Sequence, residues 1–145
     1  MRCFKLREKE SSWSECLECR TALTITPDKL RANSLITTSN SRINYLNTLE
    51  INETSANFLF ENYYNSVTEL IHAIVLNKGF KVLNHICLGF YLRDVTNNQK
   101  LFEEFDYLRN KRNTIVYYGK IMDYQLAKDA INKSKQLIKE LIKLT

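Results

Sequence analysis

Glycine and proline are scarce in this sequence, and that scarcity restricts the fold more than any other feature. The chain has three glycines and one proline among its 145 residues. Tight turns depend on both residue types, so the composition argues against a β-sandwich or a β-barrel. Gly79, Gly89 and Gly119 also lie too far apart for a P-loop or a dinucleotide-binding fingerprint. We therefore expect an all-α fold.

Apolar residues recur every three or four positions in four long segments, which is typical of helices with one buried face. Thr26, Pro27 and Asp28 mark the start of the first segment, because they combine a capping side chain, a first-turn proline and an acidic group. Asn84 is expected to cap a shorter helix that extends to about Leu92. The long helices are predicted at about 27–49, 55–78, 100–118 and 124–144. Together they predict an up-and-down bundle of four main helices with short N-terminal and connecting helices.

The second long segment has the longest apolar stripe of the chain. Gly79 and Gly119 are expected to end two of the long helices, and Gly89 to mark a close contact between helices. The predicted core face of the second helix consists of Leu59, Phe60, Tyr63, Val67, Leu70, Ile71, Ile74 and Val75.

Residues 1–25 form a polar lead-in to the bundle, which occupies residues 26–145. Trp13, Cys16 and Leu17 predict one short amphipathic helix in the lead-in that packs on the bundle. No apolar run approaches the length of a membrane span, and the first residues have no apolar core of signal-peptide length. We therefore expect a cytoplasmic protein without membrane association. In that compartment its four cysteines are expected to be reduced thiols.

Two patterns suggest metal ligands, and both are incomplete. Cys16-x-x-Cys19 with Cys3 supplies three thiolates, one fewer than a closed zinc site requires. Glu69-x-x-His72 matches one half of the carboxylate and imidazole set of di-iron bundles. The other histidine, His85, has a valine where the second glutamate would be. We therefore predict neither a metal nor another cofactor.

The last third of the chain is the basic part. The formal net charge is +5, and residues 107–145 carry nine basic and three acidic side chains. A charged outer helix face is the ordinary explanation, and contact with a nucleic acid is the alternative. The lysines that share one face of the last helix are Lys128, Lys135, Lys139 and Lys143, with Lys133 nearby. The tyrosines that could stack on unpaired bases are Tyr107, Tyr118 and Tyr124.

An arginine interrupts the apolar stripe of the third long helix. The stripe of Leu101, Phe105 and Leu108 continues onto Arg112. Either the Arg112 stem packs while its head reaches solvent, or the site holds a paired carboxylate or a phosphate. Glu69 is a candidate carboxylate for Arg109 or Arg112. Arg109, Asn113 and Tyr117 are spaced four apart, so they lie along one side of the same helix.

Residues 108–119, with the sequence LRNKRNTIVYYG, resemble the signature of HEPN domains. That signature is an arginine, a polar residue and, a few positions later, a histidine near the end of a bundle helix. Arg112 and Asn113 match the first two places, and Tyr117 stands where the family has its histidine. The helix order from Pro27 through the last helix is also similar to that of the family.

The resemblance implies a homodimer whose two motifs face each other, because active HEPN proteins are typically metal-independent endoribonucleases of that form. It implies catalytic positions at Arg112, Asn113 and Tyr117. Tyr117 is a poor base, because a phenol titrates near pH ~10, and losing a positioned base typically costs about two to four orders of magnitude in rate. We therefore expect binding of RNA or a nucleotide with weakened or lost nuclease activity. The residues expected to contact nucleic acid are Arg109, Lys111, Tyr118 and Lys120, with Glu69 and His72 as supporting residues.

Three alternatives to that expectation stay open. In a working ribonuclease, Tyr117 or His72 would replace the missing base. In a plain helical adaptor, Arg112 would only form a salt bridge with Glu69. The resemblance also suggests a toxin-type protein with a minimal nucleotidyltransferase partner that modifies a tyrosine, for which Tyr117 and Tyr118 are the candidates.

Overall fold

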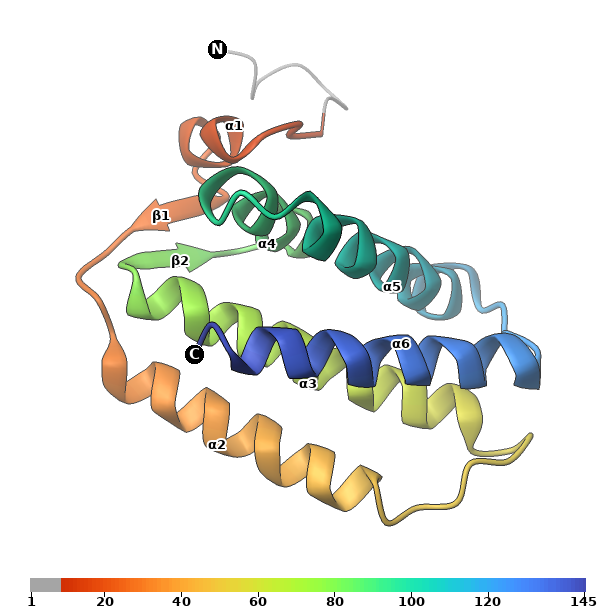
Figure 1. The fold of residues 1–145 in the computed structure, drawn as a ribbon. Helices are drawn as coiled ribbons and strands as arrows, with labels where there is room; N and C mark the ends of the chain where they lie inside the picture. Colours follow the sequence, from red (N-terminus) through yellow and green to blue (C-terminus); the bar gives the residue numbers. More distant parts are fainter. Residues whose placement is uncertain (1–8) are drawn as a thin grey trace.

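The computed structural model describes residues 9–145 and shows a helical bundle whose main helices run alternately up and down (Figure 1). The main helices are α2 (Lys29–Leu46), α3 (Ala56–Asn77), α5 (Gln99–Tyr118) and α6 (Tyr124–Ile142). The predicted all-α bundle of four main helices is thereby confirmed. No helix among the described residues is long and apolar enough to cross a membrane.

Helix α3 is the centre of the bundle and packs against both α2 and α6 (Figure 1). Its predicted core face is buried throughout, and Phe60, Tyr63 and Tyr64 are among the largest fully buried side chains. Because α3 has neighbours on several sides, its buried surface extends well beyond one stripe. The apolar residues of α6 are buried up to Leu141, while Ile142 at the end of the helix is exposed.

Local side-chain chemistry sets the ends of these helices. The carboxylate of Asp28 accepts a hydrogen bond from the Arg31 N–H and caps α2, so the cap is Asp28 rather than Thr26. Gly119 ends α5 in the left-handed conformation, with a φ of +64°. A Cβ atom at Gly89 would lie 3.2 Å from the Phe102 ring. The close helix contact predicted at Gly89 is therefore confirmed.

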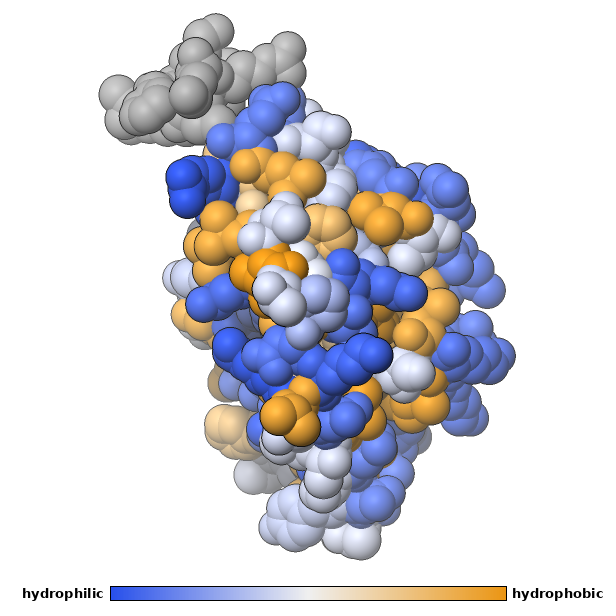
Figure 2. Space-filling model, turned by 90° about the vertical axis from the view of Figure 1, so that its left-hand side faces the viewer, coloured by the Kyte–Doolittle hydropathy of each residue, from blue (hydrophilic) through white to orange (hydrophobic). Residues whose placement is uncertain are grey.

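The lead-in is joined to the bundle by a small sheet that the sequence analysis did not predict. Strand β1 (Ala22–Thr24) pairs antiparallel with β2 (Phe80–Val82), which directly follows α3. Each strand has only three residues, too few for an alternating pattern to be recognised in the sequence. Figure 2 shows this end of the molecule. On the surface formed by the described residues, hydrophilic residues (blue) lie between the apolar residues (orange).

The predicted short helix of the lead-in is present as α1 (Trp13–Glu18), and it packs on α4 (His85–Phe90) and on the π-helical turn η2 (Tyr91–Val95). The Trp13 ring meets the edge of the Tyr91 ring, with 5.2 Å between centroids. The Trp13 N–H donates to the Asp94 carboxylate at 2.9 Å, and Arg93 donates to the Ser11 carbonyl. These contacts hold α1 firmly against the bundle.

A disulfide between Cys16 and Cys87 links α1 to α4, and Cys19 is also disulfide-bonded. The expectation of reduced thiols is therefore wrong for these three residues, while Cys3 lies outside the described residues. That expectation rested on the compartment and took no account of where the helices meet. Packing of α1 on α4 brings the two Cα atoms to 6.1 Å, a separation that a disulfide spans without backbone movement.

Candidate anion-binding cleft

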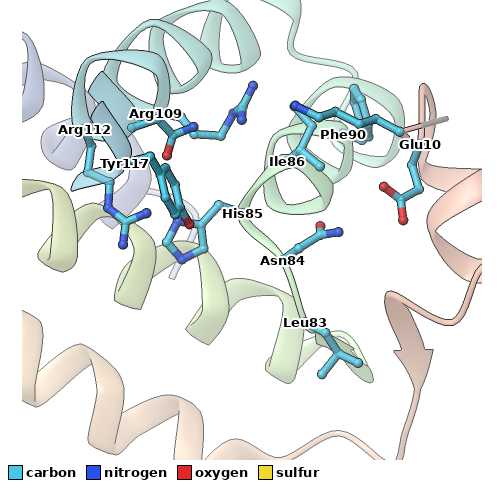
Figure 3. Close-up of a pocket in the computed structure, with 11 residues that line it drawn as sticks. Glu10, Leu83, Asn84, His85, Ile86, Phe90, Arg109, Arg112 and Tyr117 are labelled. Carbon is cyan, nitrogen blue, oxygen red and sulfur yellow. The ribbon is translucent and has the colours of Figure 1, made fainter. Parts of the chain in front are cut away.

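An open cleft of about 630 Å³ lies between the start of α4, the second half of α5 and the lead-in (Figure 3). Three basic side chains and one acidic side chain line it, so its walls carry net positive charge. The lining residues are Lys9, Glu10, Leu83, Asn84, His85, Ile86, Phe90, Arg109, Arg112, Asn113 and Tyr117.

Helix α5 supplies the predicted part of the cleft. Arg109, Arg112, Asn113 and Tyr117 all line it, as expected for side chains three or four residues apart on one helix. The three positions that match or replace the HEPN signature are therefore in one place. Tyr117 is 70% exposed, so its ring is available to a ligand in the cleft.

Arg112 lies half-buried among aromatic rings. Its guanidinium carbon is 5.6 Å from the centre of the Tyr64 ring and 5.9 Å from that of Tyr117. No carboxylate of the described residues forms an ion pair with Arg112. The stem of this arginine thus packs in the apolar stripe while its charge faces the cleft without a counter-ion among residues 9–145, which suits an anionic ligand.

Arg109 differs from Arg112 because its charge is already paired. Its Nε and Nη2 donate to one carboxylate oxygen of Asp106, at 3.0 and 2.8 Å. The predicted pairing of Glu69 with Arg109 or Arg112 is wrong, since Glu69 binds Arg42 of α2. Glu69 thus faces α2 rather than α5, and helical periodicity alone does not indicate which neighbour a helix face meets.

His72 lines a separate hollow of about 110 Å³, together with Arg31 of α2 and Lys81 of β2. Burial, followed by the charges of His85 and Arg31, lowers the pKa of His72 to about 4. The imidazole of His72 is therefore neutral near pH 7. The structure does not place it with the α5 residues that line the cleft.

Lys111, Tyr118 and Lys120 are also not among the residues that line the cleft. The Lys111 ammonium lies 5.3 Å from the centre of the Tyr107 ring, which Lys133 of α6 approaches to 4.1 Å from its own helix. Tyr118 and Lys120 are exposed at and just beyond the end of α5. A long ligand that leaves the cleft could reach these two residues, but they do not shape it.

From the sequence, His85 was considered only as a metal ligand, and its place at the cleft was missed. The amide oxygen of Asn84 accepts from the Cys87 N–H and caps α4, which places His85 on the first turn, at the cleft. Nδ1 of His85 lies 2.8 Å from the Tyr64 hydroxyl. Burial and then the charges of Arg112 and Arg109 lower the pKa of His85. The predicted cap directly before one of only two histidines was the available signal.

The lining of the cleft suits an anion better than a metal ion. The side chains around it offer two guanidiniums, one ammonium, one carboxylate and one imidazole. Among the described residues, no group of three histidine, cysteine, aspartate or glutamate side chains is placed to hold a metal ion.

Comparison with protein-family models, with curated proteins and with solved structures found no match to this chain. Its function therefore has to be argued from the geometry of the cleft.

Proposed function

We propose that the cleft binds single-stranded RNA through its phosphates and at least one of its bases. The observation that carries this proposal is the Arg112 guanidinium, half-buried in an open cleft and free of any described carboxylate. A guanidinium matches phosphate oxygens with two parallel N–H donors. Arg109, although paired with Asp106, adds positive charge to the same wall.

The other α5 residues of the cleft suit the sugar and base of the same ligand. The exposed Tyr117 ring offers a stacking surface, and the Asn113 amide offers both a donor and an acceptor. A volume of about 630 Å³ lies in the range of small-molecule sites and holds a nucleotide unit. A free nucleotide presents the same groups as one unit of RNA, so it is the alternative ligand.

The resemblance to HEPN domains supports the same proposal and adds a homodimer to it. Val116, Tyr117, Tyr118 and Ile121 leave large apolar surfaces exposed at the end of α5, beside the cleft. Such a patch favours a protein contact, and in a homodimer it would bring two clefts together. Tyr117 and Tyr118 are also exposed enough for a nucleotidyltransferase partner to reach them.

The proposal is tested by fluorescence anisotropy with fluorescein-labelled oligouridine over a series of salt concentrations. Arg112→Ala is expected to weaken binding about tenfold or more, the loss of one charge-assisted contact, and to reduce the salt slope by about 0.7. Lys139→Ala is the matched control, because it removes one positive charge from the exposed face of α6. It is expected to change the dissociation constant by less than about twofold.

Three results would contradict the proposal. Equal losses in the two variants would place the RNA on the basic surface as a whole. Binding only of mononucleotides would favour the nucleotide alternative, and no binding at low salt would favour the helical adaptor. Sedimentation of the wild-type protein at micromolar concentration tests the homodimer, which a monomer under those conditions would rule out.

A further inference from the structure

We propose that His85 is the general base of a metal-independent RNA cleavage reaction in this cleft, held in position by Tyr64. This inference rests on the proposed function, because it requires RNA to lie along the same wall. It assigns the proton transfer to a residue of α4, whereas the HEPN signature has its histidine at the position of Tyr117 in α5. The support comes from the position of the imidazole, from the groups around it and from the failure of the other candidate bases.

The position of the imidazole is fixed from two sides. The Asn84 cap begins α4 directly before His85, and Nδ1 of His85 lies 2.8 Å from the Tyr64 hydroxyl. Tyr64 is fully buried on α3, where its ring stacks against Phe105 at a centroid distance of 6.1 Å. With Nδ1 occupied by Tyr64, Nε2 is the ring nitrogen left for a ligand in the cleft.

Tyr64 contacts both the imidazole of His85 and the guanidinium of Arg112. The Arg112 guanidinium lies over the ring of Tyr64, and the hydroxyl of the same residue contacts His85. Arg112, Tyr117 and His85 all line the cleft (Figure 3). A phosphate held by Arg112 would therefore have an imidazole within reach of the adjoining ribose.

The charges around His85 favour the state that a base requires. Burial and the two guanidiniums of α5 lower the pKa of His85, so its imidazole is neutral near pH 7. Burial raises the pKa of Tyr64, whose phenol therefore keeps its proton. The base requires the tautomer in which Nδ1–H donates to the Tyr64 oxygen, because only then is Nε2 free to accept a proton. The titratable and charged groups near His85 are Arg109, Arg112 and Tyr117 of α5, Tyr64 and His72 of α3, and Lys9 and Glu10 of the lead-in.

The reaction needs only the RNA and a proton acceptor. His85 Nε2 takes the proton from a ribose 2′-hydroxyl, and the 2′-oxygen forms a bond to the adjoining phosphorus. The bond from phosphorus to the 5′-oxygen of the next nucleotide breaks, and that oxygen takes a proton from water or from the imidazolium. Arg112 stabilises the negative charge that develops on the phosphate oxygens. The products are a 2′,3′-cyclic phosphate and a 5′-hydroxyl end, with no change of oxidation state.

The two other candidate bases fit this role less well. The Tyr117 ring is mostly exposed, and an ordinary phenol keeps its proton at neutral pH. His72 is neutral but lines its own hollow with Arg31 and Lys81. Of the three, only His85 combines a neutral imidazole with a place in the cleft.

The test uses a 5′-fluorescein RNA oligonucleotide and the full chain in the presence of EDTA, with products separated on a denaturing gel. Wild type is expected to yield products with 2′,3′-cyclic phosphate ends and to leave the all-2′-deoxy oligonucleotide intact. His85→Gln is expected to lower the cleavage rate about 10²- to 10⁴-fold while RNA affinity stays within about threefold. His72→Gln is the matched control and should cleave at the wild-type rate.

Two further measurements guard against a folding defect in the His85 variant. The wild-type rate should rise with pH and level off below pH ~6.5, because the base has a lowered pKa. Tyr64→Phe should lower kcat roughly ten- to a hundredfold with KM within about threefold, as expected for a positioning residue. A rate that rises up to about pH 10 would assign the base to a phenol and overturn the inference.

The failures of the two proposals are distinguishable. Salt-dependent RNA binding without cleavage overturns the role of His85 and leaves the proposed function standing. The same conclusion follows if His85→Gln cleaves at the wild-type rate, or if cleavage requires a divalent ion. Absence of RNA binding overturns both proposals together.

Discussion

The two histidines of this chain both have a lowered pKa, but they line different spaces. Burial is the first cause that lowers the pKa of both His72 and His85, so both are neutral near pH 7. His72 lies in a hollow of about 110 Å³, and the neighbouring Glu69 is already paired with Arg42. His85 lies in a cleft of about 630 Å³ that Arg112 also lines, and none of the described carboxylates forms an ion pair with Arg112. A lowered pKa thus indicates burial in both cases. What distinguishes the candidate site is the larger open space beside His85, with two arginines of α5 on its wall.

The disulfide that attaches α1 to α4 supports the cleft of His85 and not the hollow of His72. The disulfide of Cys87 to Cys16 lies two residues after His85 and closes a loop with a sequence separation of 71. Cys16→Ala combined with Cys87→Ala is expected to lower the free energy of unfolding by about 2–4 kcal/mol. Hydrogen exchange should increase in α1 and at the start of α4, and RNA cleavage should fall.

The His72 hollow serves as the internal control for the disulfide variant. Helices α2 and α3 are held mainly by the apolar core, so hydrogen exchange there should change little below global unfolding. A denaturant titration that shows unchanged stability, or exchange that increases equally around His72 and His85, would contradict the assignment of the disulfide to the wall of the cleft.

The pH dependence of stability tests the burial of His72. The pKa of His72 is about 4 in the fold, against 6.5 in an unfolded chain. Between these values the unfolded chain binds a proton that the folded His72 does not, so stability is lost as the pH falls from 6.5 to 4. The loss amounts to about 2–3 kcal/mol. It is absent above pH 6.5, where both states are neutral.

Denaturant unfolding at pH 7.5, 5.5 and 4 measures this loss. Carboxylates also titrate in this range, so the difference between wild type and His72→Gln is the quantity to compare. His72→Gln should remove most of the contribution, and His85→Gln should remove a further part in the same direction. If His72→Gln loses as much stability as wild type between pH 7.5 and pH 4, His72 does not cause the loss and water reaches its hollow.

The periodicity of the sequence was enough to predict the bundle but not to join its parts. Each long helix has an apolar stripe, so its existence follows from local spacing. The cleft depends on α4 meeting α5 and on α1 meeting α4, and no local pattern indicates which faces meet. For the same reason Glu69 was given the wrong partner, and the disulfide of Cys16 was missed. Arg112 was found because a charged residue in an apolar stripe is a local anomaly, whereas His85 interrupts no pattern.

The smallest expected effect concerns the charge of Arg109, which Asp106 now partly neutralises. Asp106→Asn keeps the shape of the side chain and removes one negative charge beside the cleft. RNA affinity should increase about two- to fivefold at low salt and return to the wild-type value at high salt, because the effect is Coulombic and largely screened. The same change should lower the pKa of His85 further, since the charge of Arg109 already lowers it.

Asp129→Asn is the matched control, because Asp129 also pairs with a cation of its own helix, Lys133 of α6, and lies away from the cleft. It makes the same change in net charge away from the cleft, so it should leave both RNA affinity and the pH profile of cleavage unchanged. If the two variants gain affinity equally, the RNA responds to the overall charge of the molecule. A gain confined to Asp106→Asn would place a phosphate next to Arg109, on the side of the bundle that holds His85 rather than His72.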